Sequence, residues 1–490
     1  MSHHSLHTVV SWQSIPYQRK KTMSPKQHIT SAKDIIPFKQ KVLYGSGAFA
    51  DMTFQYAIFI LAMPIFNLEL GVNPMYIGMV IAFTRIWDAF TDPMVGSLSD
   101  NMRSRFGRRR PFIAIGGILA GIFYAVVWLV PEGMSEMGIA IYFLITAILF
   151  YTSYTVFSVP FYAMGYEMSP DHHERTKIMA VRIFANSFNG IIFFPWIYWI
   201  IQRSFWETPM QGVRVVGIGT GLLMMILAII PALTIKEPSR KYVKKQVRVP
   251  VLQSVKSTLS NKPFLFLMIA FLIAIFAYNA VASMLIYPIT YSVFGGDSEA
   301  ASAWFGFALM GMHAAVIITS FVGVYLSNKI GKRRATMLLS SFIGIGSLAQ
   351  LFCFVPGIPW LIPIPQFIMG IGWAGLWILV SSMIADVVDY DEWKTGTRRE
   401  GMFGAIHFWV FKLGFGLGAL LSGFILNSTG FNVDLGNNQP DGTLSQIIML
   451  LSIIPAMGVC VVIYFISRYP ISEENAYETR TKLEERRGES

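Results

Sequence analysis

Twelve long stretches of predominantly apolar residues follow one another along the chain, separated by polar segments. A helix needs about 20 consecutive apolar residues to cross the hydrocarbon core of a bilayer. Each stretch therefore predicts one transmembrane helix, and the pattern as a whole predicts an all-α membrane protein. The predicted spans are residues 43–67, 75–98, 111–130, 137–166, 177–202, 212–234, 263–292, 300–327, 335–355, 360–385, 401–427 and 444–467.

The polar segments divide these spans into two groups of six. The expected domains are a tail at 1–40, a six-helix bundle at 41–234, a central loop at 235–262, a second six-helix bundle at 263–467 and a tail at 468–490. Lysine and arginine gather in the central loop and in alternate short loops, and basic loops are typical of the cytoplasmic side. This pattern predicts that both termini and the central loop are cytoplasmic.

The two groups of spans share a short motif. Residues Gly96–Arg110 read GSLSDNMRSRFGRRR, and residues Gly323–Arg334 read GVYLSNKIGKRR. Both segments place a glycine near a helix end, then polar residues, a glycine turn and a basic cluster. Parallel six-helix repeats are the plan of major facilitator transporters. We therefore expect two six-helix pseudo-repeats with the major facilitator fold.

Composition narrows the class of protein further. Charged residues make up only 14% of the 490 residues, against about 25% in soluble domains, and mean hydropathy is +0.51. The net charge of +11 lies in the loops, so it does not indicate a nucleic-acid partner. The two cysteines, Cys353 and Cys460, lie inside apolar runs, which argues against a disulfide scaffold or a cysteine metal cluster. The sequence contains no Walker loop and no nucleophile–base constellation, so we expect a carrier without a cofactor and not an enzyme.

Three charged residues interrupt the second predicted span. Arg85, Asp88 and Asp92 are spaced i, i+3 and i+7 and therefore share one helix face. Asp88 and Asp92 form a like-charge i, i+4 pair, which in a low dielectric needs a bound cation, a proton or a nearby arginine. Two carboxylates on one face suit the binding of a monovalent cation such as Na⁺ and suit proton carriage equally well. An ion pair with Arg85 that only holds helices together is the alternative.

Other polar residues at membrane depth are candidates for solute contact, because charge in the bilayer is costly and usually functional. Asp51 lies in the first span, where solute contact and a structural ion pair with Lys412 or Arg85 are both open. Lys412 is near mid-depth and too deep to snorkel, whereas Arg182 is close enough to a span end to do so. His407 and Trp377 have packing roles as alternatives.

At these residues the chain resembles a known family. The stretches RIWDAFTDPMVG (Arg85–Gly96) and SRFGRRRPF (Ser104–Phe112) resemble the glycoside–pentoside–hexuronide:cation symporters, major facilitator proteins that include melibiose permease. The stretch ADVVDYDEWKTGTRREG (Ala385–Gly401), followed by FKLG from Phe411, agrees. The resemblance covers about residues 41–467.

The resemblance implies roles for the matching positions. Asp88, Asp92 and Thr155 would form the cation site, with Thr91 where melibiose permease has an asparagine, a departure that puts sodium in doubt and leaves protons open. Asp51, Arg182 and Trp377 would line the solute site, with Lys412 between the two sites. Ser158 and Tyr162, where the chain departs from the family, and the intramembrane His407 complete our candidate solute site. Arg85 would support the cation site. Separately from the resemblance, we predict that the paired basic loops, with Asp100, Arg105, Arg108 and Arg109, pair with helix C-termini and latch the cytoplasmic side.

Two further departures concern the solute. Ser158 stands where the family has a galactoside-gripping carboxylate, and Tyr162 replaces a tryptophan. Because Arg182 and Lys412 are kept, the cavity is expected to be more positive and to favour an anionic sugar such as a hexuronide. We therefore expect a monomeric symporter in the bacterial inner membrane that couples Na⁺ or H⁺ to sugar or glycoside uptake by alternating access. A carrier of lysolipids or another non-sugar solute is the alternative.

Overall fold

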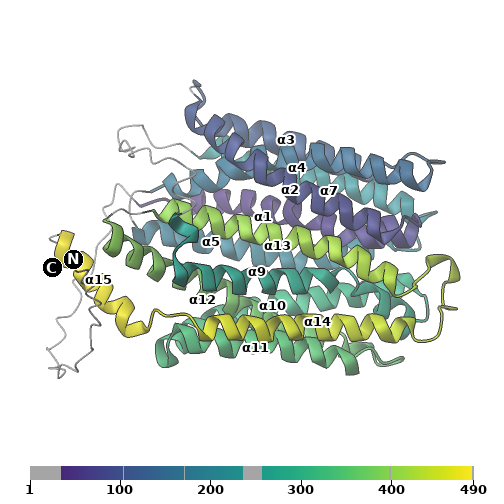
Figure 1. Cartoon of the computed structure of the whole chain (residues 1–490). Coiled ribbons are helices and arrows are strands. Elements are labelled where there is room, and N and C mark those ends of the chain that lie inside the picture. The colour runs from purple at the N-terminus through teal and green to yellow at the C-terminus, as the bar shows by residue number, and fades with distance from the viewer. Residues whose placement is uncertain (1–34, 103, 170–171, 236–256, 397–398, 488–490) are drawn as a thin grey trace, which may run out of the picture.

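The computed structural model describes residues 35–102, 104–169, 172–235, 257–396 and 399–487. Most of the predicted N-terminal tail and of the central loop lies outside these ranges. The described residues are almost entirely helical (Figure 1). The helices are α1 (Phe38–Ala62), η1 (Met63–Glu69), α2 (Pro74–Asn101), α3 (Arg110–Val127), α4 (Glu136–Glu167), α5 (His172–Ile192), α6 (Phe194–Ile201), α7 (Pro209–Thr234), α9 (Lys262–Ala282), η3 (Pro288–Val293), α10 (Ser298–Ile330), α11 (Lys332–Ala349), η4 (Gln350–Phe352), η5 (Pro359–Leu361), α12 (Pro363–Thr395), α13 (Glu400–Ser428), η6 (Val433–Leu435), α14 (Thr443–Ser467) and α15 (Glu473–Arg487).

Within the described ranges these helices confirm the predicted all-α membrane protein. Eleven are long and apolar enough to cross a membrane when α1 is joined to η1 and α5 to α6. The helix that falls short of this criterion is α2, which carries Arg85, Asp88 and Asp92, yet it is 28 residues long and packs between α4 and α13. With α2 included, the twelve predicted spans all correspond to helices.

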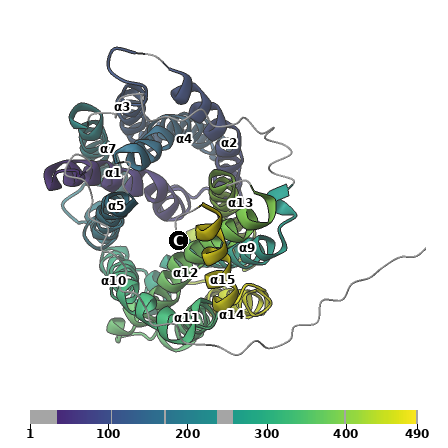
Figure 2. The ribbon, with the colours of Figure 1, turned by 90° about the vertical axis from the view of Figure 1, so that its left-hand side faces the viewer.

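The spans form two groups. One group comprises α1 to α7, in which α3 packs against α4 and α7, and α1 packs against α5 and α7. The second comprises α9 to α14, in which α12 packs against α10 and α11, and α9 packs against α13 and α14. Figure 2 looks at the end of the bundle where α1 begins and α14 ends, and shows the two groups on opposite sides. We call this end the terminal face and the other end the opposite face.

The shared motif has the same structure in both halves. Gly107 and Gly331 adopt positive φ angles of 109° and 83°, which a residue with a Cβ rarely adopts. The basic residue after each glycine pairs with an acid on the fourth span of its half: Arg108 Nη2 lies 2.8 Å from Glu167 Oε1, and Lys332 Nζ lies 2.7 Å from Asp386 Oδ2. This equivalence supports the internal repeat.

Contacts between the halves gather toward the opposite face. Glycines allow α2 and α13 to approach closely there: a Cβ on Gly423 would lie 2.3 Å from the carbonyl oxygen of Pro74. A hydrogen bond of 2.6 Å from Tyr287 Oη to Asn67 Oδ1 and an ion pair of 3.0 Å between Arg203 and Glu299 also cross between the halves. The halves are therefore held together at the face away from the termini.

The predicted boundaries differ from the structure most at α12 and after α14. The span predicted to end at 385 continues to Thr395, because its last turns are polar but still helical. Residues 473–487, predicted to lie in a polar tail, form the helix α15, which packs against α12 at the terminal face (Figure 1). Leu483 of α15 is buried.

Candidate functional site

The centre of the molecule contains a cluster of charged side chains from α2 and α13. Lys412 of α13 forms an ion pair with Asp92 Oδ2, and its Nζ also lies 3.4 Å from Asp88 Oδ2. Arg85 Nη1 lies 3.3 Å from the same Asp88 oxygen. Asp88 is fully buried, whereas the side chain of Asp92 is 29% exposed. The two carboxylates therefore share two cationic side chains, and Lys412 contacts both of them.

Arg85 is held in place from three sides. Its Nη2 donates to the hydroxyl of Tyr151 and to the carbonyl oxygen of Gln55, both at 3.1 Å. Its guanidinium also lies over the rings of Tyr151 and Phe415, at 4.4 and 4.6 Å from the ring centroids. These contacts leave Arg85 little freedom to leave Asp88, whereas Lys412 has a flexible stem.

Oxygen atoms surround the two carboxylates. Thr155 Oγ1 donates to Asp92 Oδ1 at 3.0 Å, and Asp88 Oδ1 is buried with no hydrogen-bond partner among the described residues. Thr91 is buried, and its hydroxyl donates to the carbonyl oxygen of Trp87 at 3.3 Å. Asp88, Asp92 and Thr155 thus present carboxylate and hydroxyl oxygens, the ligands that hard cations prefer. The role of Thr91 stays a prediction, because its hydrogen bond runs to its own helix.

The helix α4 links this cluster to a second polar group. Tyr151 and Thr155 face α2, where they contact Arg85 and Asp92. Tyr154, Ser158 and Tyr162 follow at i, i+4 and i+8 and so line a neighbouring face of the same helix. A single helix therefore positions side chains of both predicted sites.

Asp51 of α1 lies in this second group. Its carboxylate is fully buried and accepts hydrogen bonds from Tyr154 Oη to Oδ1 at 2.9 Å and from Tyr162 Oη to Oδ2 at 2.5 Å. Ser158, between the two tyrosines in sequence, is also buried. The structure gives Asp51 no ion pair with Lys412 or Arg85, which were its predicted structural partners.

The guanidinium of Arg182 of α5 stacks on the ring of Tyr162. Its guanidinium carbon lies 4.0 Å from the centroid of the Tyr162 ring. Its Nη1 is 3.9 Å from Met179 Sδ, its Nε has no partner, and it forms no ion pair with any residue that the structure describes. Arg182 thus lies against Tyr162, and its buried Nε has no hydrogen-bond partner among the described residues.

Trp377 and His407 lie in the second half, in an aromatic cluster. The ring of Phe271 lies 4.9 Å from that of Trp377 and 4.5 Å from that of His407, centroid to centroid. His407 is buried, and its Nε2 has no hydrogen-bond partner among the described residues. Phe408, next in sequence, lies 6.3 Å from the ring of Tyr162 across the interface between the halves. The aromatic cluster therefore adjoins Tyr162 through Phe408.

The predicted latch residues lie at the terminal face. Arg109 Nη2 is 3.0 Å from Asp100 Oδ1 and 2.8 Å from Glu167 Oε1, and Arg108 pairs with the same Glu167. These pairs join helices of one half, so they brace that half rather than link the two. Arg105 is exposed and lies over the ring of Phe106, with 4.7 Å between its guanidinium carbon and the ring centroid.

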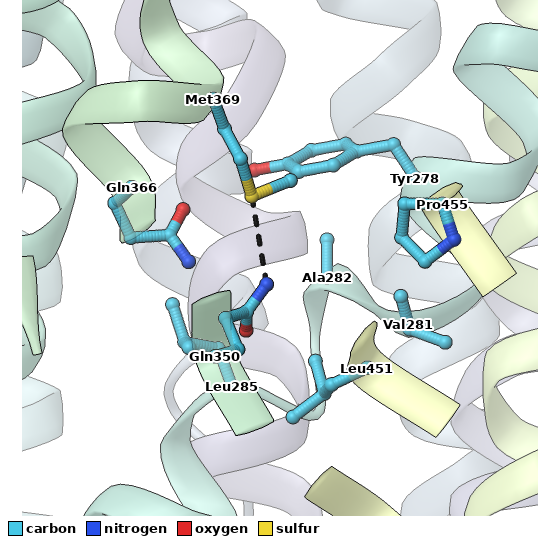
Figure 3. Close-up of a pocket in the computed structure, with 9 residues that line it drawn as sticks. All are labelled: Tyr278, Val281, Ala282, Leu285, Gln350, Gln366, Met369, Leu451 and Pro455. Atoms are coloured by element: carbon cyan, nitrogen blue, oxygen red, sulfur yellow. Dashed lines mark hydrogen bonds between the residues drawn. The ribbon is translucent and has the colours of Figure 1, made fainter. Parts of the chain in front are cut away.

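A small cavity lies elsewhere, inside the second half between α9, α12 and α14 (Figure 3). Its polar lining consists of Tyr278, Gln350 and Gln366, and Gln350 Nε2 approaches Met369 Sδ at 3.5 Å. No charged side chain lines it. The candidate site is therefore the charged centre and not this cavity.

Some of the site was missed by sequence reasoning. Tyr151, Tyr154 and Glu167 were not predicted, although each makes a direct contact to a predicted residue. The i, i+4, i+8 spacing of Tyr154, Ser158 and Tyr162 is the signal that would have shown Tyr154. Nothing in the sequence indicates that Arg109 meets Glu167 as well as Asp100, because 58 residues separate Arg109 from Glu167.

Comparison with known proteins places the chain among transporters. The sequence matches the family model described as MFS/sugar transport protein over residues 43–473. An uncharacterized symporter of Synechocystis sp. is 26% identical and covers 92% of this chain and 97% of its own length. A glucuronide carrier protein homolog of Escherichia coli is 23% identical over 85% of this chain and 89% of its own.

A sodium-dependent lysophosphatidylcholine symporter of Xenopus tropicalis is also 23% identical, over 86% of this chain and 85% of its own. Among solved structures, a bacterial homologue of the human lysosomal transporter Spinster, in an inward-facing and unoccupied conformation, has a TM-score of 0.62. It is 16% identical and covers 91% of this chain and 96% of its own. This likeness concerns the fold, which is the major facilitator fold.

Proposed function

This chain belongs to the MFS/sugar transport protein family, and from that premise we propose that it carries an anionic sugar of the hexuronide class together with Na⁺ or H⁺. It is a multi-pass membrane protein and a cation symporter, not an enzyme. The solute, the coupling ion and the residues that bind them are the proposed part. We also propose a bacterial inner-membrane location with both termini in the cytoplasm, supported by the basic loops at the terminal face.

The observation that carries the proposal is the position of Lys412. Its ammonium group contacts both Asp88 and Asp92, so a sodium ion or a proton arriving at these carboxylates competes with it. Once displaced, Lys412 is a cation without a partner in a low-dielectric centre. An anionic solute is the natural partner for that charge, and binding of the cation thus promotes binding of the solute.

The charge balance of the centre supports an anion as the solute. Asp51, Asp88 and Asp92 are balanced by Arg85, Arg182 and Lys412. A cation alone would leave an excess positive charge at membrane depth, and an anionic solute alone would leave an excess negative charge. The two together restore neutrality, which favours moving both ligands in one step. Arg182, which forms no ion pair with any residue that the structure describes, suits a carboxylate.

Alternating access supplies the movement. The contacts between the halves near the opposite face hold that side closed. In this state the site exchanges solute and cation with the solution on the side of the terminal face. Rocking of the halves about the central site would break the opposite-face contacts and expose the site there.

Transport into right-side-out vesicles tests the proposal. Radiolabelled methyl glucuronide, neutral methyl glucoside and lysophosphatidylcholine are offered with and without a Na⁺ gradient at two pH values. We expect cation-driven accumulation of the glucuronide. Asp88→Asn and Asp92→Asn should abolish accumulation and spare exchange of the glucuronide down its gradient. Concentrative uptake that is unchanged in both variants would reject the cation site.

A lysolipid-like zwitterion is the second candidate solute, and the likeness to the lysophosphatidylcholine symporter favours it. Its phosphate would take the place proposed for the carboxylate at Arg182. Cation-driven uptake of lysophosphatidylcholine in the same vesicles, without uptake of either sugar, would decide for this candidate.

A further inference from the structure

We infer that Asp51 does not touch the transported solute and acts on it through Tyr162, whose hydroxyl is the solute contact. This inference rests on the proposed function and names the residue that recognises a solute hydroxyl. Asp51 is then a positioning residue.

The surroundings of Asp51 leave no room for a direct contact in this state. The carboxylate is fully buried, and each of its oxygens already accepts a hydrogen bond from a tyrosine. Hydrogen bonds to a charged acceptor are stronger than those between neutral groups. The carboxylate keeps further lone pairs, but because it is fully buried, a solute hydroxyl could reach it only if a surrounding side chain moved aside.

The two tyrosines are not equivalent. Tyr154 is buried, and its ring packs against Phe54 and Phe150 inside the first half. Tyr162 is partly exposed and lies where the halves meet, with Arg182 on its ring and Phe408 of the other half nearby. Only Tyr162 combines contact with Asp51 and access to the space between the halves.

The direction of the hydrogen bond fixes what Tyr162 can recognise. Because its proton is donated to Asp51, the phenol oxygen has only lone pairs left for a ligand. It therefore accepts a hydrogen bond from a solute hydroxyl, while Arg182 beside it donates to an acidic group. The pair fits a solute that carries a hydroxyl close to a carboxylate.

A double-mutant cycle for methyl glucuronide uptake separates the two roles of Asp51. Asp51→Asn and Tyr162→Phe should each raise KM about tenfold, the effect of losing one such hydrogen bond. If Asp51 acts through the Tyr162 hydroxyl, the double variant should have nearly the same KM as either single variant. A multiplied effect of about a hundredfold would show that Asp51 contacts the solute itself and would overturn the inference. Tyr166→Phe, one turn further along α4 at an exposed position, is the matched control and should leave KM unchanged.

A labelling experiment tests the inference without measuring transport. Cysteine is introduced at position 162 or 51 in a Cys353→Ser, Cys460→Ser background, and thiol labelling is followed with and without methyl glucuronide. We expect the solute to slow labelling of Tyr162→Cys and expect Asp51→Cys to stay unlabelled. Solute-protected labelling of Asp51→Cys alone would overturn the inference.

Failure of the proposed function has a different signature. If methyl glucuronide is not accumulated by the unmodified protein, the solute class is wrong, and the same cycle is run with whichever of the other two labelled solutes is transported.

Discussion

At the scale of single residues, Lys412 connects the proposed cation site with the proposed solute site. It is 16% exposed, pairs with Asp92 and lies 3.4 Å from Asp88. Arg85 also contacts Asp88, but its hydrogen bonds to Tyr151 and Gln55 fix it there. Of the two cations, Lys412 is the one able to leave the carboxylates when a cation arrives.

Replacing Lys412 by glutamine tests this competition. Without the ammonium group, Asp88 and Asp92 should bind the coupling cation more tightly, and the half-saturating cation concentration should fall by about tenfold. Solute accumulation should be lost, because no released charge remains to attract the solute. Direct binding of radiolabelled Na⁺ to the purified protein and uptake of methyl glucuronide are the measurements. Lys332→Gln, which breaks an ion pair with Asp386, is the control and should leave the cation dependence unchanged; an equal shift in both variants would contradict the competition.

The sequence was sufficient to predict many of the site residues, but not the contacts that they make between helices. The i, i+3, i+7 spacing is sufficient by itself to place Arg85, Asp88 and Asp92 on one helix face. The contact of Lys412 with Asp92 was not predictable by spacing, because 320 residues separate them. The shielding of Asp51 by two tyrosines depends on how α1 and α4 pack, which no local pattern encodes.

At the scale of helices, close approach decides how the two halves meet. The contact of α2 with α13 near the opposite face depends on glycines, since a Cβ on Gly78 would lie 2.7 Å from the carbonyl oxygen of Ala419 and one on Gly423 would lie 2.3 Å from that of Pro74. A side chain at either position would push backbone against backbone.

Gly423→Ala should therefore weaken closure of the opposite face. A cost of about 1 kcal/mol or more is expected from overpacking, which shifts the equilibrium between the two states by about fivefold or more. Labelling of Phe59→Cys, at a buried position that packs against Phe415 of the other half, should become faster from the opposite face. Gly401→Ala lies on the same helix with open space around it and should leave labelling unchanged. The same rate in both variants would mean that the glycine contact does not control closure.

A buried acid fixes α5 to α1. Glu174 is fully buried, pairs with Lys41 and Lys177, and accepts a hydrogen bond of 3.0 Å from the backbone N–H of Ile36. Burial raises the pKa of this carboxyl, but the hydrogen bonds from the lysines and the backbone outweigh it and hold the pKa below its ordinary value. Its ionised form therefore stabilises the junction at neutral pH.

Thermal unfolding in detergent tests this junction through its pH dependence. Because the pKa of Glu174 is lowered in the folded state, its ionised form contributes stability above about pH 4.3, the ordinary pKa of glutamate. This contribution is lost as the pH falls through the pKa of Glu174 in the folded state. Glu174→Gln should lower the melting temperature by a few degrees at pH 7, and the gap from the unmodified protein should narrow below pH 4. Glu478→Gln, at an exposed position of α15, should have little effect at either pH. A gap that is constant with pH would contradict an ionised Glu174.

The helices themselves were more predictable than their ends. The apolar pattern indicated all twelve spans, even α2 with its three charges, because apolar residues flank the charges on both sides. The apolar pattern failed at α12, where Asp386 to Thr395 continue the helix with polar side chains. It also failed at α15, which lies in a polar segment although its Leu483 is buried.

At the scale of the whole molecule, the two halves are the moving parts, and the ion pair between Arg203 and Glu299 crosses between them at the opposite face. Each side chain is about one-third exposed, so the pair is worth at most about 1 kcal/mol. The pair therefore makes a small contribution to the free-energy difference between the two conformations and does not determine its sign.

Reversing the charge of either partner should change the free-energy difference between the two conformations, and reversing both should restore it. Arg203→Glu and Glu299→Arg should each alter the maximal uptake rate by up to about fivefold, since like charges then face each other. The double variant restores opposite charges and should return the rate toward the original. Uptake rates of the single and double variants are the measurement, and failure of the swap to restore the rate would remove the pair from the closure mechanism.

The long sequence separation between Asp92 and Lys412 has a consequence for biogenesis. When α2 leaves the ribosome, its lysine partner still lies 320 residues downstream, which at about 5–20 residues per second takes roughly 15–60 s to synthesise. During that interval Arg85 of the same helix is present as a counter-charge for Asp88, but Lys412, the ion-pair partner of Asp92, is not. Assembly of the second half therefore completes the membrane integration of the first.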